Sequence, residues 1–212
     1  MTENSLRQAA ADSRPKVEPL RAIELPAAAS LAAAAFCDDP YWLALGPRRP
    51  GLRRPLIAAE TRRQLRHATR AGDALLAIHA GGGLAAIARV ADECRHRPPR
   101  VPPPAIAACG PVGAARWRSF EAQLASLLPS YRHHYLYTLA VAPVWQRTGL
   151  GRTLLTEIID RAVACRRPLL LDTMTRQNVL WYRRFGFAEI ADLALPRRHH
   201  AWIMEWRATA QD

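Results

Sequence analysis

Lysine and cysteine are scarce in this chain, and both scarcities limit the chemistry that it can carry. Lys16 is the only lysine, so arginine supplies nearly all of the positive charge. The four cysteines are Cys37, Cys94, Cys109 and Cys165. None of them belongs to a CxxC pair, and no histidine lies at ligand spacing from them, so we expect no metal site. In a reducing compartment we also expect free thiols rather than structural disulfides.

The sequence also lacks a long hydrophobic segment. No apolar run reaches the roughly 20 residues that a membrane-spanning helix needs, and the first residues contain no apolar core of a secretory signal. Residues 1–16 are polar and small, which predicts a disordered N-terminal leader. Residues 17–212 are predicted to form a single domain. Because the sequence shows no other targeting signal, we expect a cytoplasmic protein that does not bind a membrane.

Acidic residues are too few to balance the basic ones. The chain has 30 Lys and Arg residues against 18 Asp and Glu, which gives a formal net charge of +12. Such an excess is typical of proteins that bind nucleic acid, a membrane surface or a phosphorylated ligand, and it also arises from a compositional preference. The arginines are scattered along the chain, and alanine is overused as well. We therefore favour a compositional preference with one anionic ligand, and we expect no nucleic-acid partner.

The beginning of the sequence predicts one strand and two helices. Residues 17–25 favour a short strand, and residues 26–36 favour an alanine-rich helix that begins at a proline. Residues 46–55 predict a basic loop. Residues 56–71 carry apolar residues at helical spacing, and Gly72 is a stop signal.

The middle of the sequence predicts a hairpin and a third helix. Two apolar runs within residues 73–92 surround a glycine turn and fit two paired strands. Residues 93–104 are rich in proline and predict an extended connection. Residues 112–130 favour a helix that is closed by a proline.

The last part of the sequence alternates strands and helices. Residues 134–141 are aromatic and aliphatic and predict a strand. Residues 151–167 predict a helix with one buried face, formed by Leu154, Leu155, Ile158, Ile159, Ala162 and Val163. The remaining predictions are a doubly covered strand at 168–173, a short helix at 178–187, and two final antiparallel strands at 188–195 and 199–207.

A turn with two glycines joins the strand at 134–141 to the helix that follows. The first backbone N–H groups of a helix have no partner within it, and the helix dipole favours an anion there. Gly149 and Gly151 have no side chain, so a diphosphate can approach these groups, with Arg147 and Arg152 on either side. Taken alone, the pattern is better explained by an ordinary tight turn. It lacks the third glycine of the dinucleotide fingerprint and the Gly-Lys-Ser/Thr of the Walker loop.

Two segments of the chain resemble the GCN5-related N-acetyltransferases (GNAT). "LAVAPVWQRTGLGRTLL" is similar to the acetyl-CoA-binding motif of that family, Gln/Arg-x-x-Gly-x-Gly/Ala, with matches at Gln146, Gly149 and Gly151. "LDTMTRQNVLWYRRFGF" is similar to the family's second signature, with matches at Asn178, Tyr182, Gly186 and Phe187. The two blocks stand in the family's order and spacing and cover roughly the last 80 residues. The segments "HYLYTLAV" and "TRQNVLWYRRFGF" resemble the subgroup that acetylates small amines, including puromycin-type antibiotics.

The resemblance implies a fold and a cofactor site. The fold is α/β, with a mixed, mostly antiparallel central sheet that is splayed between strands 4 and 5 and flanked by helices. The pantetheine arm of acetyl-CoA lies in that gap and pairs with the backbone near Leu139 and Val141, while the glycine turn holds the pyrophosphate. The implied cofactor-binding residues are Leu139, Ala140, Val141, Gln146, Arg147, Thr148, Gly149, Leu150, Gly151, Arg152 and Asn178.

The resemblance also gives Tyr182 a catalytic role, as the proton donor to the sulfur of the departing thiolate. A phenol has a reference pKa of about 10 and a thiol about 8.5, so the donor acts only with help from its position. Without the resemblance, Tyr182 is better explained as a core aromatic beside Trp181 and Phe185. Asn178 is equally well explained as a helix N-cap.

The sequence does not identify the residue that acts as general base. An alkyl amine is protonated at neutral pH, so some group must accept its proton before it attacks a thioester. The candidates are Asp172, Asp38 or Asp39, Glu60, and His133 or His134. A chain of water molecules is a further alternative, and no single residue is assigned.

Together these observations predict an acetyl-CoA-dependent N-acetyltransferase. It transfers the acetyl group to a primary amine of a small molecule by direct attack in a ternary complex. Alternatives are a protein acetyltransferase acting on an N-terminus or lysine, and a non-catalytic module that binds acyl-CoA. The alanine-rich first half and the late aromatic strands are compatible with a homodimer, but no residue decides it.

Overall fold

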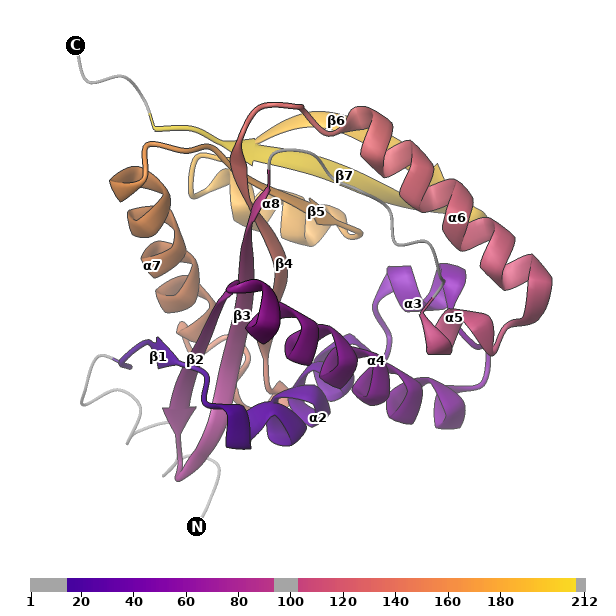
Figure 1. The fold of residues 1–212 in the computed structure, drawn as a ribbon, viewed down its shortest axis with the longest axis horizontal. Helices are drawn as coiled ribbons and strands as arrows, with labels where there is room; N and C mark the ends of the chain where they lie inside the picture. Colours follow the sequence, from indigo (N-terminus) through magenta and orange to yellow (C-terminus); the bar gives the residue numbers. More distant parts are fainter. Residues whose placement is uncertain (1–14, 94–102, 209–212) are drawn as a thin grey trace.

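The structure is a computed structural model that describes residues 15–93 and 103–208. Its described part contains a seven-stranded sheet in the order β1-β2-β3-β4-β5-β7-β6 (Figure 1). The strands are β1 Glu18–Pro19, β2 Ala74–Ala80, β3 Gly83–Glu93, β4 His133–Val141, β5 Leu169–Thr173, β6 Ala188–Leu195 and β7 His199–Trp206. The pair β4–β5 is parallel, and the other five are antiparallel. Of the leader predicted over residues 1–16, residues 1–14 lie outside the described residues.

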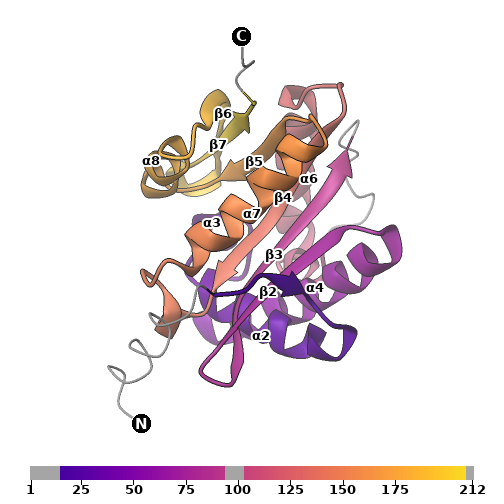
Figure 2. The same ribbon diagram turned by 90° about the vertical axis from the view of Figure 1, so that its left-hand side faces the viewer.

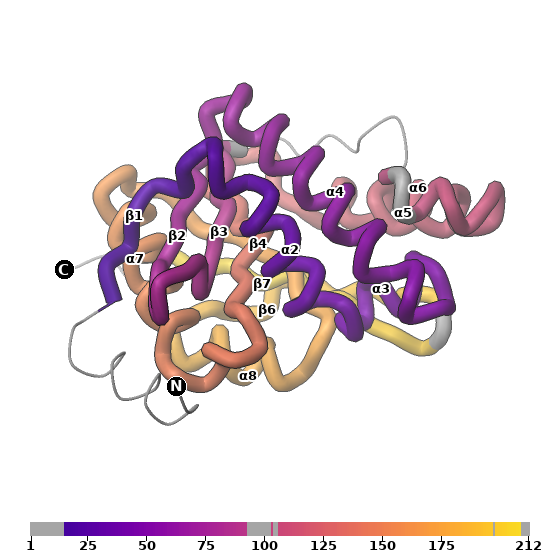
Figure 3. The backbone as a smooth tube through the Cα atoms, turned by 90° about the horizontal axis from the view of Figure 1, so that it is seen from below, coloured from indigo at the N-terminus to yellow at the C-terminus, as the bar shows by residue number. Residues whose placement is uncertain are grey.

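Helices cover both faces of the sheet. The helices are α2 Leu25–Phe36, α3 Pro40–Leu45, α4 Pro50–Ala71, α5 Pro104–Ala107, α6 Gly110–Leu127, α7 Leu150–Ala164 and α8 Arg176–Arg183. Short 3-10 turns lie at Ala22–Glu24, Pro143–Trp145 and Pro196–Arg198. In Figure 2, α7 crosses one face while α2 and α4 lie behind the strands, and Figure 3 shows α2 and α4 side by side.

Alternation along the strands divides the core between the two faces, because successive side chains of a strand point to opposite sides. Leu136 and Leu169 pack with α7 and α8 on one face. Tyr135 and Leu170, their neighbours in sequence, pack on the opposite face with α3 and α6. Ala140 belongs to that second face too, where it meets α2.

The sheet opens between β4 and β5. These strands pair only through His134 with Leu169 and Tyr135 with Leu170, although β4 pairs with β3 along its whole length. A register shift between Arg89 and Val90 leaves an extra residue in β4 just past the last pair with β5. Such a bulge bends its strand and increases its twist. The bend accounts for the divergence, and the splayed mixed sheet expected from the sequence is confirmed.

Most of the predicted elements are confirmed, but the basic loop at 46–55 is wrong. Helix α4 begins at Pro50 and therefore includes half of that segment. Proline is well tolerated at the first helical position, where no N–H partner is needed. Pro55 lies just beyond the first turn, where it has no N–H to donate to the carbonyl of Gly51, so one hydrogen bond is missing there.

Three smaller expectations also need correction. The strand predicted over 17–25 covers only Glu18–Pro19, because a 3-10 turn and then α2 follow. Helix α5 was not predicted, and the rest of the proline-rich connection, residues 94–102, lies outside the described residues. Val163 does not belong to the buried face of α7, since 48% of it is exposed.

Within the described residues, no helix is long and apolar enough to cross a membrane.

Candidate active site

The open edge of β4 presents backbone groups to the gap. The N–H of Ala142 donates to the carbonyl of Ala85 at 2.9 Å, so that residue directs its backbone toward β3. In an antiparallel ladder the direction alternates by residue. Ala140 therefore also faces β3, and Leu139 and Val141 direct their N–H and C=O groups toward the side where β5 has diverged. Of the three residues proposed here from the sequence, the structure brings Leu139 and Val141 to the gap.

The glycine turn builds a helix N-terminus without a side-chain cap. Gly149 is the N-cap of α7, in the left-handed region with φ of 97°, and no side chain caps the helix there. The first helical bond runs from the N–H of Thr153 to the carbonyl of Gly149 at 3.0 Å. The N–H groups of Leu150, Gly151 and Arg152 precede that bond, so they have no partner within the helix.

The residues before Gly149 shape this turn. Thr148 donates from its hydroxyl to the carbonyl of Trp145 at 2.6 Å, and Arg147 is left-handed with φ of 65°. Gln146 donates from its side-chain amide to the carbonyl of Val141 at 3.3 Å. The Gln146 contact links the turn directly to the open edge of β4.

Gly151 marks the place where three elements meet. A Cβ atom there would lie 3.6 Å from Val141, 3.7 Å from Leu139 and 3.8 Å from Trp181, which are ordinary contact distances. A Cβ atom at Gly149 would have nothing within 4 Å. The turn, the β4 edge and α8 thus surround one position, and open space lies beside the helix N-terminus. The backbone geometry fits a diphosphate with an attached amide-containing arm.

Asn178 lies on the first turn of α8 but is not its cap. Thr175 is the N-cap, and its hydroxyl accepts a hydrogen bond from the N–H of Asn178 at 3.1 Å. The N-cap interpretation of Asn178 is therefore wrong. Its side-chain amide donates to the hydroxyl of Thr173 at 3.1 Å, and the side chain is exposed near the end of β5.

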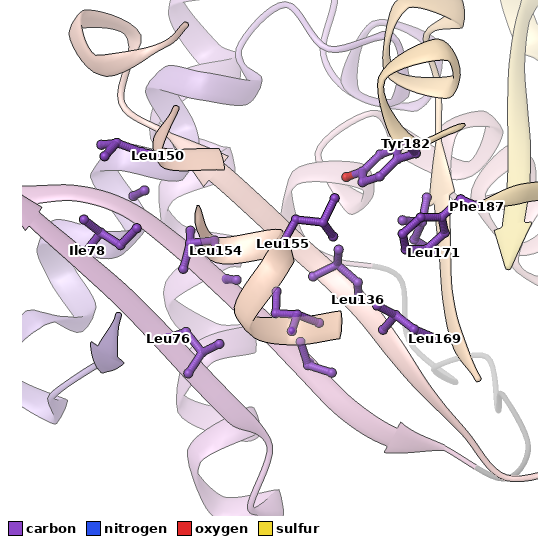
Figure 4. Close-up of a cluster of buried hydrophobic side chains, with 14 of the residues drawn as sticks. Leu76, Ile78, Leu136, Leu150, Leu154, Leu155, Leu169, Leu171, Tyr182 and Phe187 are labelled. Carbon is purple, nitrogen blue, oxygen red and sulfur yellow. The ribbon is translucent and has the colours of Figure 1, made fainter. Parts of the chain in front are cut away.

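Tyr182 belongs to the core beneath α7 and α8 (Figure 4). It is 8% exposed, and its ring lies 4.9 Å from that of Trp181 and 5.4 Å from that of Phe187. Its hydroxyl has no hydrogen-bond partner among the described residues, and Figure 4 shows the oxygen directed along the cluster toward Leu155. Burial, together with the negative charge of Asp172, raises the pKa of Tyr182.

Arginine dominates the surface around the turn. Arg147 and Arg152 are both exposed, and the guanidinium of Arg152 lies 5.5 Å from the ring centre of Phe185. On the neighbouring α8, Arg176 and Arg183 pair with Glu189 at 2.9 Å and 2.8 Å. The exposed pair Arg147 and Arg152 adds positive charge where the helix dipole already favours an anion.

The surroundings of the six candidate bases differ, and four of them do not lie free at the open end of the gap. Glu60 is buried and forms an ion pair with Arg63 at 2.6 Å. Asp38 is exposed and pairs with Arg53 at 2.9 Å. His133 and His134 lie at the start of β4, on the paired side of the point where β4 and β5 diverge. These four residues are occupied elsewhere or distant from the open end of the gap.

Asp172 and Asp39 remain, and they act on one another. Asp172 lies on β5, two residues past the last pair with β4, and accepts a hydrogen bond from the hydroxyl of Tyr135 at 2.5 Å. Asp39 caps α3 by accepting from the N–H of Tyr41 at 2.8 Å. Burial, with the charge of Asp172 beside it, raises the pKa of Asp39 to about 6. Among the described residues, no group of acidic, histidine or cysteine side chains could hold a metal ion.

Comparisons with known proteins agree with this geometry. Residues 106–189 match the model of the acetyltransferase (GNAT) domain family. The fold is similar to a structure described as histone acetyltransferase HPA2 and related acetyltransferase from Corynebacterium glutamicum, with 19% identity and a TM-score of 0.66. That similarity covers 93% of this chain and 99% of the other.

Two further solved structures show the same fold. One is the ribosomal-protein-S18-alanine N-acetyltransferase from Escherichia coli, with 17% identity, a TM-score of 0.56 and coverage of 93% and 97%. The other is YncA from Salmonella typhimurium with its cofactor acetyl-CoA, with 15% identity, a TM-score of 0.57 and coverage of 94% and 96%. At such identities the likeness shows the fold, and it does not single out the small-amine subgroup.

Proposed function

We propose that this chain, of which residues 106–189 match the model of the acetyltransferase (GNAT) domain family, transfers an acetyl group from acetyl-CoA to a primary amine of a small molecule. The amine attacks the thioester directly in a ternary complex. The observation that carries the proposal is the meeting of the open β4 edge, the uncapped N-terminus of α7 and helix α8 around Gly151. Few other ligands need both strand-like backbone pairing and a diphosphate site.

Acetyl-CoA would use this face, called here the cofactor side, which carries α7 and α8. The backbone groups of Leu139 and Val141 pair with the amides of the pantetheine arm in the manner of an added strand. The N–H groups at the start of α7 hold the pyrophosphate. Arg147 and Arg152 add charge, and Asn178 contacts the arm or a phosphate. The opposite face, with α2 to α6, is called the acceptor side.

Tyr182 supplies the proton to the departing sulfur. Burial keeps its hydroxyl protonated at neutral pH, and the hydroxyl has no partner among the described residues. A raised pKa makes a phenol a weaker acid, so its contribution depends on being held at the sulfur as the C–S bond breaks. The core packing of Tyr182 supplies that fixed position.

The first experiment is acetyl-CoA binding measured by isothermal calorimetry on the wild type and on Gly149→Trp. Gly149 has open space beside it, so an indole there fills the diphosphate position. We expect the substitution to abolish binding. Gly72→Trp is the matched control, because Gly72 is also left-handed, with φ of 81°, and also has nothing within 4 Å.

Binding by the wild type and Gly72→Trp but not by Gly149→Trp would support the cofactor site. It would justify a screen of amines for thiol release. Equal binding by all three proteins would place acetyl-CoA elsewhere. No binding by a folded wild type would overturn the proposed function.

A protein acceptor is the second candidate. Two of the similar folds are described as a ribosomal-protein alanine N-acetyltransferase and a histone acetyltransferase with its relative. Thiol release with peptides that carry a free N-terminus or lysine, and none with small amines, would favour it. Acetyl-CoA binding without turnover of either class would favour a non-catalytic module, in which the unpartnered hydroxyl of Tyr182 would have no role.

A further inference from the structure

The acceptor side gathers carboxylates and tyrosines where the sheet opens, in a chain whose net charge is +12. Asp172 follows Leu170, and by strand alternation its side chain lies on the same face as Tyr135. In the continuing parallel register the residue of β4 opposite Asp172 is Tyr137, across the gap. The ring centres of Tyr135 and Tyr137 are 4.8 Å apart.

Helix α3 brings a second carboxyl to this place. Trp42 and Leu45 of α3 pack in the same cluster as Leu170 of β5. Asp39, at the N-terminus of the helix, uses Oδ1 to accept from the N–H of Tyr41, and its Oδ2 accepts nothing from the described residues. No cationic side chain of residues 15–93 or 103–208 pairs with Asp39. Arg53, on the adjacent helix, is taken by Asp38 and by the carbonyl of Cys37.

We propose that Asp39 is the general base of the reaction, and that Asp172, held by Tyr135, positions the acceptor's ammonium group between the two carboxyls. The inference rests on the proposed function and assigns the acceptor half of the same site. An ammonium group supplies the positive charge that Asp39 does not receive from the protein. Tyr41, Tyr137 and Asp39 are each partly exposed, so the place is reachable from solvent.

The proton balance of the step is complete. The ammonium group gives one proton to Asp39 and becomes a neutral amine, which attacks the acetyl carbon and forms the N–C bond. The C–S bond breaks, its electron pair leaves with sulfur, and sulfur takes a proton from Tyr182. The nitrogen loses a second proton, which restores Tyr182, and Asp39 releases the first to solvent. One proton is thus released for each acetyl group transferred.

Asp39 suits a base because it titrates near neutrality. Burial and the charge of Asp172 raise its pKa to about 6, so it is ionised at pH 7.5 and still a stronger base than an exposed carboxylate. The titratable and charged groups in the surroundings of the pair are Tyr41 on α3, Arg53 and Glu60 on α4, Glu121 on α6, Tyr135 and Tyr137 on β4, Tyr182 on α8, and Arg89, which lies over the Tyr137 ring.

The test uses steady-state acetylation of methylamine, benzylamine, tryptamine and putrescine, followed by thiol release between pH 5 and 9. Asp39→Asn keeps the helix cap, since Asn caps as well as Asp, and removes only the base. We expect kcat to fall about 100-fold or more, with KM for the amine changed less than threefold. The rise of kcat/KM with pH through about 6 should disappear.

Asp172→Asn should act differently, raising KM for the amine at least tenfold with a smaller loss of kcat. Asp160→Asn, an exposed carboxylate on α7, is the control and should leave both constants unchanged. Asp39→Ser provides a second capping residue without a carboxyl, should Asp39→Asn not fold. Acetyl-CoA affinity by calorimetry should be the same in all of these proteins.

The two proposals fail in distinguishable ways. Loss of acetyl-CoA binding in the wild type overturns the proposed function. Intact acetyl-CoA binding with Asp39→Asn keeping more than a third of wild-type kcat, or keeping the pH dependence, overturns the assignment of the base. Intact binding without turnover of any of the four amines overturns the assignment of this face to a small ammonium group.

Discussion

The cofactor side and the acceptor side border the same gap, yet they carry opposite charges and are built in different ways. The cofactor side offers backbone N–H groups and the arginines Arg147 and Arg152, all within a short stretch of sequence. The acceptor side offers Asp39 and Asp172, which lie more than 130 residues apart in the chain and are brought to one cluster by α3 and β5. An anion-binding site can be local because one helix terminus supplies it. A site for an ammonium group needs side chains from several elements.

The arrangement also orders the chemistry. In the proposed reaction, acetyl-CoA would enter a surface that already attracts anions, and the amine would enter one that attracts cations. The negative charge of Asp172 acts on both Asp39 and Tyr182. The proposed proton acceptor and proton donor therefore stand on opposite faces of the sheet and are coupled through one carboxylate.

The largest expected effect comes from Tyr182, the proposed proton donor. Tyr182→Phe should lower kcat about 100-fold at pH 7.5, while acetyl-CoA affinity and melting temperature stay near wild type, because its hydroxyl has no partner among the described residues. Steady-state kinetics, calorimetry and thermal unfolding measure the three quantities. A loss of acetyl-CoA affinity as large as the loss of kcat would show that Tyr182 binds rather than donates.

The next effect concerns stability on the acceptor side. The pKa of Asp39 is about 6 in the folded protein against an ordinary value of 3.8. A raised folded pKa gives stability that is present below pH 4 and is lost as the pH rises through about 6. Asp39→Asn, which does not ionise, should therefore melt a few degrees higher than wild type at pH 7.5 but not at pH 4.

Asp38→Asn is the neighbouring control for that measurement. Asp38 is exposed and paired with Arg53, so its substitution should not raise the melting temperature at pH 7.5. An equal rise in both variants would trace the effect to the net charge of the protein and not to the burial of Asp39.

A smaller effect is expected from the arginines of the cofactor side. Arg147→Ala and Arg152→Ala should each weaken acetyl-CoA binding about twofold to fivefold, since an exposed charge near a helix terminus contributes about 0.3–1 kcal/mol. The difference should shrink in high salt. Arg54→Ala on α4 is the control, and calorimetry at two salt concentrations makes the comparison. A loss that does not respond to salt would contradict an electrostatic role.

The smallest effect on acetyl-CoA binding is expected at Gly151, which differs from Gly149 in its tolerance of a side chain. Gly151→Ala should change acetyl-CoA affinity less than twofold and leave stability unchanged or slightly higher, because a Cβ atom there makes only ordinary contacts. Gly149→Ala forces a left-handed alanine at a cost of about 1–2 kcal/mol and should lower the melting temperature by several degrees. Equal behaviour in thermal unfolding would show that the backbone of the turn adjusts.

Local signals in the sequence account for what could be predicted. The glycine hairpin, the stop at Gly72 and the helix after Gly149 follow from backbone preferences within a few residues, and all are confirmed. The extent of α4 was missed because its prolines indicated a loop, whereas the helix packing retains Pro50 and Pro55. The exposure of Val163 was missed because helical spacing does not fix the width of the covered face.

By itself, the sequence determined the order of the elements and the cofactor side, because that side is one strand, one turn and one helix in succession. Strand alternation could have placed Tyr135 and Tyr137 on one face. Only the tertiary structure decided which carboxyl stands at the gap. Asp39 comes under the charge of Asp172 because α3 and β5 share one buried cluster, while Glu60 and Asp38 are paired with Arg63 and Arg53. Such pairing depends on contacts between distant segments, and no local pattern records them.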